Sequence, residues 1–251
     1  MAQVYFIGAG PGDIELLTIK AKEIIERADV IIYADSLISP EICRLARHDA
    51  RIYKSASLTL EETTDIISNA VEQGKTVARL QSGDPSIYGA IGEQMAALDE
   101  KGIRYNIIPG VSSLFAAAAA LKAELTVPEI SQTVIITRRE GRTPVPTAES
   151  LISLAKHGAT IALFLSTSLA QEAVAELIQG GYAPDTPAAL VYKASWKDEK
   201  VILTTLSELP GQIKKSGIKK QGLILVGKFL DRQGQELRSK LYDGNFSHEY
   251  R

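Results

Sequence analysis

Cysteine, tryptophan and histidine are scarce in this sequence of 251 residues. Cys43 is the only cysteine, so an internal disulfide is excluded and cysteine usage does not fix the redox compartment. The three histidines, His48, His157 and His248, stand far apart and lack the spacing of a ligand set. We therefore expect no protein-bound metal.

Strong net charge and long apolar runs are also missing. A net charge of −2 gives no global field to attract nucleic acid or an anionic membrane. The longest apolar runs, such as residues 114–121, fall short of the roughly 20 residues that a membrane-spanning helix needs. The first residues lack a basic region followed by a long apolar one, so we expect no signal peptide. Together these absences predict a cytoplasmic enzyme or binding protein, with no nucleic-acid or membrane partner.

Short apolar runs alternate with longer stretches of helical spacing in the first half of the chain. This alternation is typical of an α/β fold with a largely parallel sheet. We expect strands at residues 4–7, 30–33, 76–80 and 105–108, and helices at 16–27, 60–73, 89–101 and 113–122.

The pattern restarts in the second half, with strands expected at residues 134–137, 160–165, 188–192, 201–204 and 223–226 and helices at 147–156 and 169–179. No helix fits between residues 192 and 201, so those two strands are predicted to be antiparallel neighbours in a mixed sheet. Pro128 follows two β-branched residues and ends the helical pattern. We expect two αβα domains, residues 1–120 and 121–251.

Three loops rich in glycine follow strands: residues 8–13 (Gly-Ala-Gly-Pro-Gly-Asp), 82–89 (Ser-Gly-Asp-Pro-Ser-Ile-Tyr-Gly) and 108–113 (Ile-Pro-Gly-Val-Ser-Ser). Ligands of open α/β sheets bind at the carboxyl ends of the strands, so three such loops predict a shared crevice.

The first loop has two other interpretations, a dinucleotide-binding fingerprint or a simple turn. In the fingerprint, Asp29 or Asp35 would hold the ribose. However, Asp13 stands where the fingerprint needs its third glycine, and Pro11 removes an N–H that a pyrophosphate would use.

The same loops, with Leu17-Thr18 and residues 29–33 (Asp-Val-Ile-Ile-Tyr), resemble the tetrapyrrole (corrin/porphyrin) methyltransferases over the whole chain. Further segments resemble one branch of that family, whose members methylate C-11 of precorrin-4, with or without cobalt, in cobalamin biosynthesis. The most specific of these segments are residues 140–146 (Glu-Gly-Arg-Thr-Pro-Val-Pro) and 238–243 (Arg-Ser-Lys-Leu-Tyr-Asp).

The resemblance implies two α/β domains with S-adenosylmethionine bound in an active-site cleft between them, a tetrapyrrole substrate and a homodimer. Carried over residue by residue, it predicts that the cofactor contacts Pro11, Ser82, Gly83, Asp84, Ile87, Ser112, Ser113, Leu165, Ala194, Gln221 and Gly222. Serine at position 82 departs from the glycine found in many relatives.

Methyl transfer from a sulfonium needs positioning and exclusion of water more than a catalytic triad. A base or charge stabiliser would still help to make the tetrapyrrole carbon electron-rich, and Asp35 and Lys54 are the candidates. A turn residue and a solvated lysine are the alternative interpretations of these two. Arg138, Arg139 and Arg142 are predicted to bind the substrate's carboxylates, because arginine pairs with carboxylates through two hydrogen bonds.

Two functional alternatives remain open in the sequence. The same scaffold could methylate another precorrin position, such as C-17 or C-20. The chain could also be a tetrapyrrole-binding protein without catalysis, although the intact Gly83-Asp84-Pro85 loop favours an enzyme.

Overall fold

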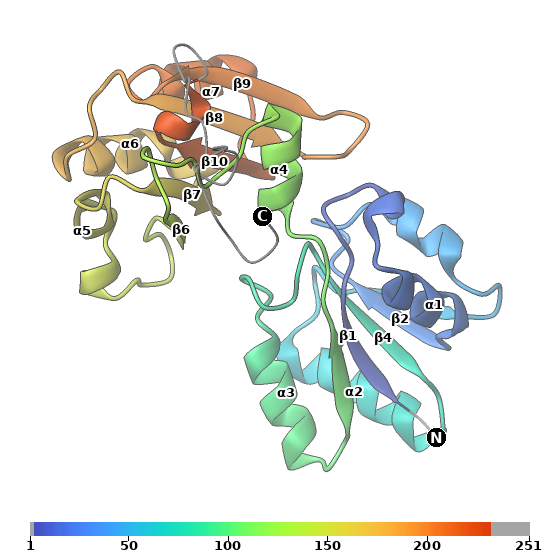
Figure 1. Cartoon of the computed structure of the whole chain (residues 1–251). Coiled ribbons are helices and arrows are strands. Elements are labelled where there is room, and N and C mark those ends of the chain that lie inside the picture. Colours follow the sequence, from blue (N-terminus) through green and yellow to red (C-terminus); the bar gives the residue numbers. More distant parts are fainter. Residues whose placement is uncertain (1–2, 232–251) are drawn as a thin grey trace, which may run out of the picture. The chain divides into compact units, whose positions relative to one another are not determined.

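The computed structural model describes residues 3–231, which form two compact units (Figure 1). Of the described residues, the first unit comprises 3–116 together with Ala194–Lys197, and the second comprises Ala117–Lys193 and 198–231. The packing thus divides the chain inside helix α4 (Ser113–Leu121). The predicted domain boundary between residues 120 and 121 stays a prediction, as does the predicted active-site cleft.

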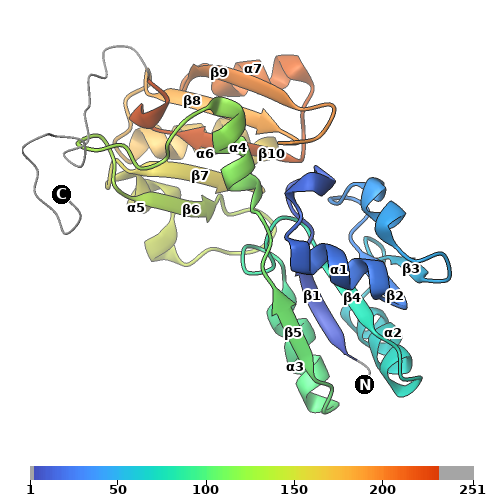
Figure 2. The ribbon, with the colours of Figure 1, turned by 45° about the vertical axis from the view of Figure 1, so that its right-hand side comes forward.

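The sheet of the first unit has five strands, and each neighbouring pair is parallel. Its order is β3-β2-β4-β1-β5, and Figure 2 shows β1, β4 and β5 running together. The predicted parallel sheet is therefore confirmed. The strands are β1 (Val4–Gly8), β2 (Val30–Tyr33), β3 (Arg51–Lys54), β4 (Val77–Gln81) and β5 (Tyr105–Ile108).

Alternation of side chains along these strands builds two cores, one on each face of the sheet. Tyr5 and Ile7 of β1 pack with α1 (Ile19–Arg27) on one face. Val4 and Phe6 pack on the other face with α2 (Leu60–Glu72) and α3 (Ile91–Glu100). Since successive strand residues point to opposite faces, a strand covered on both sides is apolar throughout, as β1 is.

Two elements of the first unit differ from the expectation. The helix expected from residue 16 begins at Ile19, because the Thr18 hydroxyl accepts a hydrogen bond from the Ala21 N–H and caps it there. Asp13 caps a separate 3-10 turn at Ile14–Leu16. The strand β3 was not expected, since it is a short edge strand with mostly exposed side chains. A further 3-10 helix spans Pro40–Leu45.

The second unit holds a mixed sheet of order β6-β7-β10-β8-β9. The strands β6 and β7 are parallel, whereas the other neighbours are antiparallel. The predictions of a mixed sheet and of β8 pairing with β9 are confirmed. The strands are β6 (Val134–Arg138), β7 (Thr160–Phe164), β8 (Pro187–Tyr192), β9 (Lys200–Thr205) and β10 (Gly222–Val226).

Three helices cover one face of this mixed sheet: α5 (Leu151–Ala155), α6 (Ala170–Gln179) and α7 (Leu209–Ser216). The helix expected at 147–156 is divided, because Ser150 caps α5 and a 3-10 turn precedes it at Thr147–Glu149. The helix α7 was not expected, since Pro210 and Gly211 in its first turn weaken the sequence signal. Short 3-10 turns also lie at Thr167–Leu169 and Lys228–Leu230. Within residues 3–231, no helix has the length and apolar character needed to cross a membrane.

Candidate functional site

The three glycine-rich loops of the first unit meet at the carboxyl ends of β1, β4 and β5. Gly10 and Gly83 bond to each other through their backbones, with N···O distances of 3.3 Å and 2.9 Å. A Cβ on Gly8 would lie 2.5 Å from the Gly110 Cα, and one on Gly110 would lie 2.2 Å from the Gly83 carbonyl oxygen. The glycines are therefore required by contact between backbones, which confirms that these loops adjoin.

Asp84 joins two of these loops. Its carboxylate accepts hydrogen bonds from the Gly110 N–H at 2.9 Å and from the N–H of Ser86 at 2.8 Å. Partial burial acts to raise the pKa of Asp84, but the hydrogen bonds from Ser86 and Gly110 outweigh it and hold the pKa below its usual value. This carboxylate is thus ionised at neutral pH and occupied in fixing the loops.

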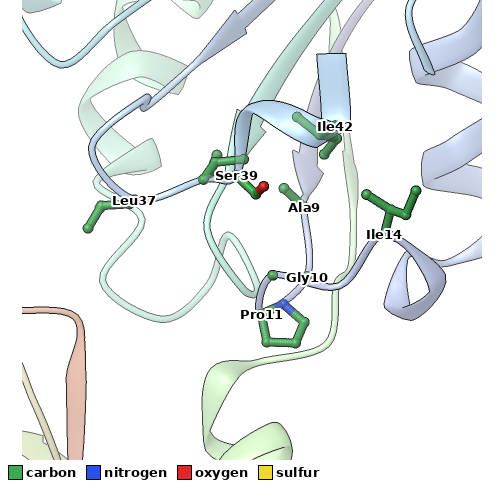
Figure 3. Close-up of a pocket in the computed structure, with 9 residues that line it drawn as sticks. Ala9, Gly10, Pro11, Ile14, Leu37, Ser39 and Ile42 are labelled. Carbon is green, nitrogen blue, oxygen red and sulfur yellow. The ribbon is translucent and has the colours of Figure 1, made fainter. Parts of the chain in front are cut away.

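A small hollow of about 10 Å³ lies beside the first loop. Figure 3 shows its lining residues on two segments, the loop that carries Gly10 and Pro11 and the segment that carries Leu37, Ser39 and Ile42. Pro11 itself is buried. A cofactor bound at this hollow would therefore contact mainly the loop backbone and the apolar side chains that line it.

The other predicted residues of the first unit lie in or beside the same loops. Ser82 and Ile87 are half-buried in the loop after β4. Ser112 is buried, and its hydroxyl accepts a hydrogen bond from the Leu114 N–H at 3.3 Å, while Ser113 begins α4. All four residues thus lie beyond the carboxyl ends of β4 and β5, where a ligand of this sheet would bind.

Asp35 and Lys54, the candidate proton-handling residues, follow the neighbouring strands β2 and β3 at the same edge. Lys54 is the last residue of β3, and both side chains are exposed. The Asp35 carboxylate accepts a hydrogen bond from the Ala56 N–H at 3.2 Å. One of its oxygens thus holds the loop after β3.

Three predicted residues of the second unit lie at one end of its mixed sheet. Leu165 follows β7 and is 65% exposed, and Gly222 begins β10 next to Gln221. The Thr167 hydroxyl donates a hydrogen bond to the Gly222 carbonyl at 2.8 Å, and a Cβ on Gly222 would lie 2.9 Å from that hydroxyl oxygen. Ala194, by contrast, is buried and packs with the first unit.

Left-handed backbone gathers beside these predicted residues. Eight non-glycine residues in the described part of the chain have positive φ. Six of them are predicted cofactor residues or lie within three residues of one: Tyr88, Ala90, Leu165, Lys193, Ser195 and Gln221. Such conformations cost free energy and concentrate at binding and catalytic sites.

The three arginines predicted to bind substrate have different surroundings. Arg138 donates to the carbonyls of Thr143 and Pro144, at 3.2 Å and 2.7 Å, and so shapes its own loop. Arg139 pairs with Glu176 at 2.8 Å. Arg142 is exposed and makes no ion pair with any residue in 3–231. Of the three, Arg142 is the one whose guanidinium makes neither a hydrogen bond nor an ion pair to residues 3–231.

Sequence reasoning missed a buried arginine in the same unit as the glycine loops. Arg79, in β4, is 8% exposed and donates to the Gln94 side chain at 3.0 Å and to the Ser55 hydroxyl at 3.0 Å. Burial lowers the pKa of Arg79 to about 10. Two residues further along β4, the Nε2 atom of Gln81 is buried without a hydrogen-bond partner among the described residues. An arginine inside an apolar strand pattern is the signal that could have identified this position.

The donor groups around the glycine loops fit a ligand without phosphate. The loops at 9–13, 82–90 and 109–112 contain no lysine or arginine, and their polar groups are backbone groups, hydroxyls and the carboxylates of Asp13 and Asp84. Such a surface suits a small cationic or neutral ligand better than a pyrophosphate. No group of three or more His, Cys, Asp or Glu side chains among residues 3–231 could hold a metal ion. The segment 238–243 lies outside the described residues.

Comparison with known proteins matches the chain along nearly its whole length. The family described as Tetrapyrrole (Corrin/Porphyrin) Methylases matches residues 3–210. A Cobalt-precorrin-4 C(11)-methyltransferase from Methanocaldococcus jannaschii is 57% identical over 249 residues, which is 99% of this chain and 96% of that protein. A Precorrin-4 C(11)-methyltransferase from Pseudomonas aeruginosa is 42% identical, with 99% and 98% of the two chains covered.

A solved structure agrees with these sequence matches. The X-ray structure of a cobalamin biosynthetic enzyme, cobalt precorrin-4 methyltransferase, superposes with a TM-score of 0.89 at 48% identity. The match covers 91% of this chain and 96% of the solved one. The similarity therefore extends through both units and is not confined to the glycine loops.

Proposed function

Because this chain belongs to the tetrapyrrole (corrin/porphyrin) methylases, we propose that it transfers a methyl group from S-adenosylmethionine to C-11 of cobalt-precorrin-4 in cobalamin biosynthesis. The observation that carries the proposal is the 57% identity, over 99% of the chain, to a protein named for this reaction. The match covers 96% of that relative, so the whole activity is carried over rather than the activity of one domain.

The cobalt-containing substrate is favoured over the metal-free one by the order of the similarities. Relatives named for cobalt-precorrin-4 are 57% and 48% identical, whereas the relative from P. aeruginosa, named for precorrin-4, is 42% identical. The metal-free substrate is the second candidate, and a direct comparison of the two decides between them.

The loops of the first unit would hold the cofactor through backbone groups. Bound S-adenosylmethionine supplies a methyl carbon made electrophilic by the positively charged sulfur. Pro11, Gly83 and Ile87 would contact the cofactor, and the fixed Asp84 carboxylate favours a nearby positive charge. The family resemblance assigns Leu165, Gln221 and Gly222 to the cofactor as well. Holding the reactants in near-attack geometry is the main contribution that such a site makes to the rate.

Asp35 would accept a proton from the tetrapyrrole, and Lys54 would stabilise negative charge on it. Both lie at the carboxyl edge of the first sheet and are accessible from solvent. Asp35 has one carboxylate oxygen bonded to the Ala56 N–H, which leaves the other oxygen able to accept a proton from substrate. Lys54 would stabilise negative charge that develops on the macrocycle.

Arg142 would bind a carboxylate of the substrate's side chains. Its guanidinium is exposed, whereas those of Arg138 and Arg139 are engaged within the protein. Arg138 and Arg139 then contribute by holding the loop in which Arg142 stands. Charge-assisted hydrogen bonds of this kind give affinity and orientation together.

The proposal is tested by anaerobic turnover with methyl-labelled S-adenosylmethionine, offering cobalt-precorrin-4 and precorrin-4 in parallel. We expect label at C-11, with a higher kcat/KM for the cobalt form. Preference for the metal-free form would assign the second candidate substrate. Label at C-17 or C-20 would contradict the proposed position, and binding of tetrapyrrole without methyl transfer would contradict the enzymatic function.

We also propose a homodimer located in the cytoplasm, on the family resemblance alone. Sedimentation equilibrium of the purified protein should give twice the mass of 27.1 kDa. A mass that stays at one chain over the accessible concentrations would contradict the dimer. Fractionation of the producing cells tests the location.

A further inference from the structure

Trp196, the only tryptophan of the chain, contacts the first glycine loop directly. Its indole Nε1–H donates a hydrogen bond to the Pro11 carbonyl at 2.8 Å. The preceding residue adds a second bond, since the Ser195 hydroxyl accepts from the Asp13 N–H at 3.0 Å. Two backbone groups of the loop are thus held by side chains that lie more than 180 residues away in the sequence.

The indole also explains why position 12 is a glycine. A Cβ on Gly12 would lie 2.1 Å from the Trp196 Cδ1 atom and 2.2 Å from its Nε1 atom. Gly10, two residues earlier, has a φ of +70° and is required by its backbone conformation instead. The loop therefore has one glycine for its turn and another to admit the tryptophan ring.

The loop needs external support because glycines flank Pro11 on both sides. The pyrrolidine ring fixes the φ of Pro11, but Gly10 and Gly12 have wide conformational freedom. The bond from Trp196 fixes the Pro11 carbonyl between these two pivots. A loop that is already in its binding shape avoids the ordering cost that a free loop would incur when a ligand binds.

We propose that Trp196 is a positioning residue, whose indole holds the loop around Pro11 in the shape that binds S-adenosylmethionine. The inference rests on the proposed function, because that function assigns Pro11 to the cofactor site. Because Trp196 would act through the loop, its loss should change cofactor affinity while the chemical step on bound substrates continues.

The main test is Trp196→Phe, which removes the N–H donor and keeps an aromatic ring. We expect the Kd for S-adenosylhomocysteine, measured by calorimetry, to rise about fivefold, since a net hydrogen bond contributes roughly that factor. The KM for S-adenosylmethionine should rise by a similar factor, with kcat within twofold of the wild type. Lys197→Ala is the matched control. Lys197 is the next residue after Trp196, and its replacement removes an ion pair to Glu41 while leaving both hydrogen bonds to the glycine loop in place.

A double-mutant cycle separates positioning from general damage to the fold. Gly12→Ala places a methyl group against the indole and should weaken binding of S-adenosylhomocysteine. In a Trp196→Ala background the same change meets no ring, so its additional effect on Kd should disappear. An equal effect of Gly12→Ala in both backgrounds would contradict the contact as the source.

The wild-type protein provides a readout that does not depend on turnover. Its tryptophan emission, excited selectively beside the nine tyrosines, comes from Trp196 alone, so titration with S-adenosylhomocysteine should shift this emission with the same Kd as calorimetry. If Trp196→Phe fails to fold, Ser195→Ala replaces it, with an expected rise in Kd of about twofold from loss of the bond to Asp13.

The outcomes distinguish the inference from the function on which it rests. Unchanged affinity in Trp196→Phe, or in Ser195→Ala if that variant is used, overturns the positioning role and leaves the methyltransferase proposal intact. Wild-type protein that binds no S-adenosylhomocysteine overturns the proposed function, and the inference with it.

Discussion

The carboxylate of Asp84 accepts a hydrogen bond from the backbone N–H of Gly110 at 2.9 Å, and so joins the loop after β4 to the loop after β5. The strands that carry these loops do not pair with each other, because β1 lies between them. Asp84 therefore spans the end of β1, where the first glycine loop begins. This bond gives the Gly-Asp-Pro motif a role in shaping the site besides any contact with ligand.

Replacement of Asp84 by alanine should affect stability and binding together. The Gly110 N–H loses its acceptor, so we expect the free energy of unfolding to fall by about 1–3 kcal/mol. Affinity for S-adenosylhomocysteine should fall as the loops separate. Urea unfolding and calorimetry measure the two effects. Ser86→Ala is the control, since it leaves the bond to Gly110 in place.

The pH dependence of Asp84 has a definite sign. Its pKa is lowered in the folded state, so its stabilising contribution is complete above the unfolded value near 4 and is lost as pH falls through the folded pKa. Urea unfolding between pH 5 and 2 should therefore show a smaller acid-dependent loss in Asp84→Ala than in the wild type. Identical acid profiles would contradict this assignment.

Substitution of Gly110 by alanine should force the three loops apart. The new Cβ would lie 2.2 Å from the Gly83 carbonyl oxygen and 2.7 Å from the Gly8 Cα, and these backbone atoms have no room to move. We expect a loss of about 1–3 kcal/mol in unfolding free energy, as for other overpacked sites. Thermal unfolding checks the result.

Gly92→Ala provides the control for that substitution. A Cβ on Gly92 meets nothing within 4 Å, and the residue lies in α3. Alanine there should stabilise the protein by about 0.5–1 kcal/mol, because glycine is unfavourable inside a helix. Similar destabilisation at both positions would show that the loops do not meet as described.

Arg142→Ala should raise the KM for the tetrapyrrole about tenfold and leave the Kd for S-adenosylhomocysteine nearly unchanged. The reason is that this guanidinium is exposed and free of ion pairs among residues 3–231, and so is available to a substrate carboxylate. Arg139→Ala should instead lower the melting temperature, because it breaks the partly buried pair with Glu176. Steady-state kinetics and thermal unfolding distinguish the two variants. If Arg142→Ala changed the KM for the tetrapyrrole and the Kd for S-adenosylhomocysteine by the same factor, the result would indicate general damage to the fold.

Tyr182 should make the second unit sensitive to alkali. Burial raises the pKa of Tyr182 to about 12, and its hydroxyl donates a hydrogen bond to the Ala159 carbonyl. The unfolded tyrosine ionises near pH 10, so above that pH the unfolded state loses a proton that the folded state keeps, and stability falls until about pH 12.

The variant Tyr182→Phe removes this titration. We expect its unfolding free energy at pH 7 to be about 1 kcal/mol lower, because the Ala159 carbonyl loses its donor. Between pH 10 and 12 the variant should lose less stability than the wild type. Urea unfolding across this range measures the difference, and parallel profiles would contradict the assignment.

Local pattern determined the element types and much of the candidate site. Apolar runs of four or five residues identified β1 and β2, because a strand covered on both faces needs apolar side chains throughout. The short connection between residues 192 and 201 determined the antiparallel pairing of β8 and β9. The exposed strand β3 and the helix α7 were missed, since their sequences carry little of either periodicity.

Within the site, the sequence alone determined which loops are rich in glycine and which contain Asp84, Pro11 and the three arginines. The tertiary structure decided what those residues contact. The strand order β4-β1-β5 places Gly8 against Gly110. Arg139 pairs with Glu176, and the Pro11 carbonyl accepts a hydrogen bond from Trp196. Composition and periodicity report on neighbours within a few residues along the chain. Contacts across tens to hundreds of residues depend on strand order and packing, which no local pattern encodes.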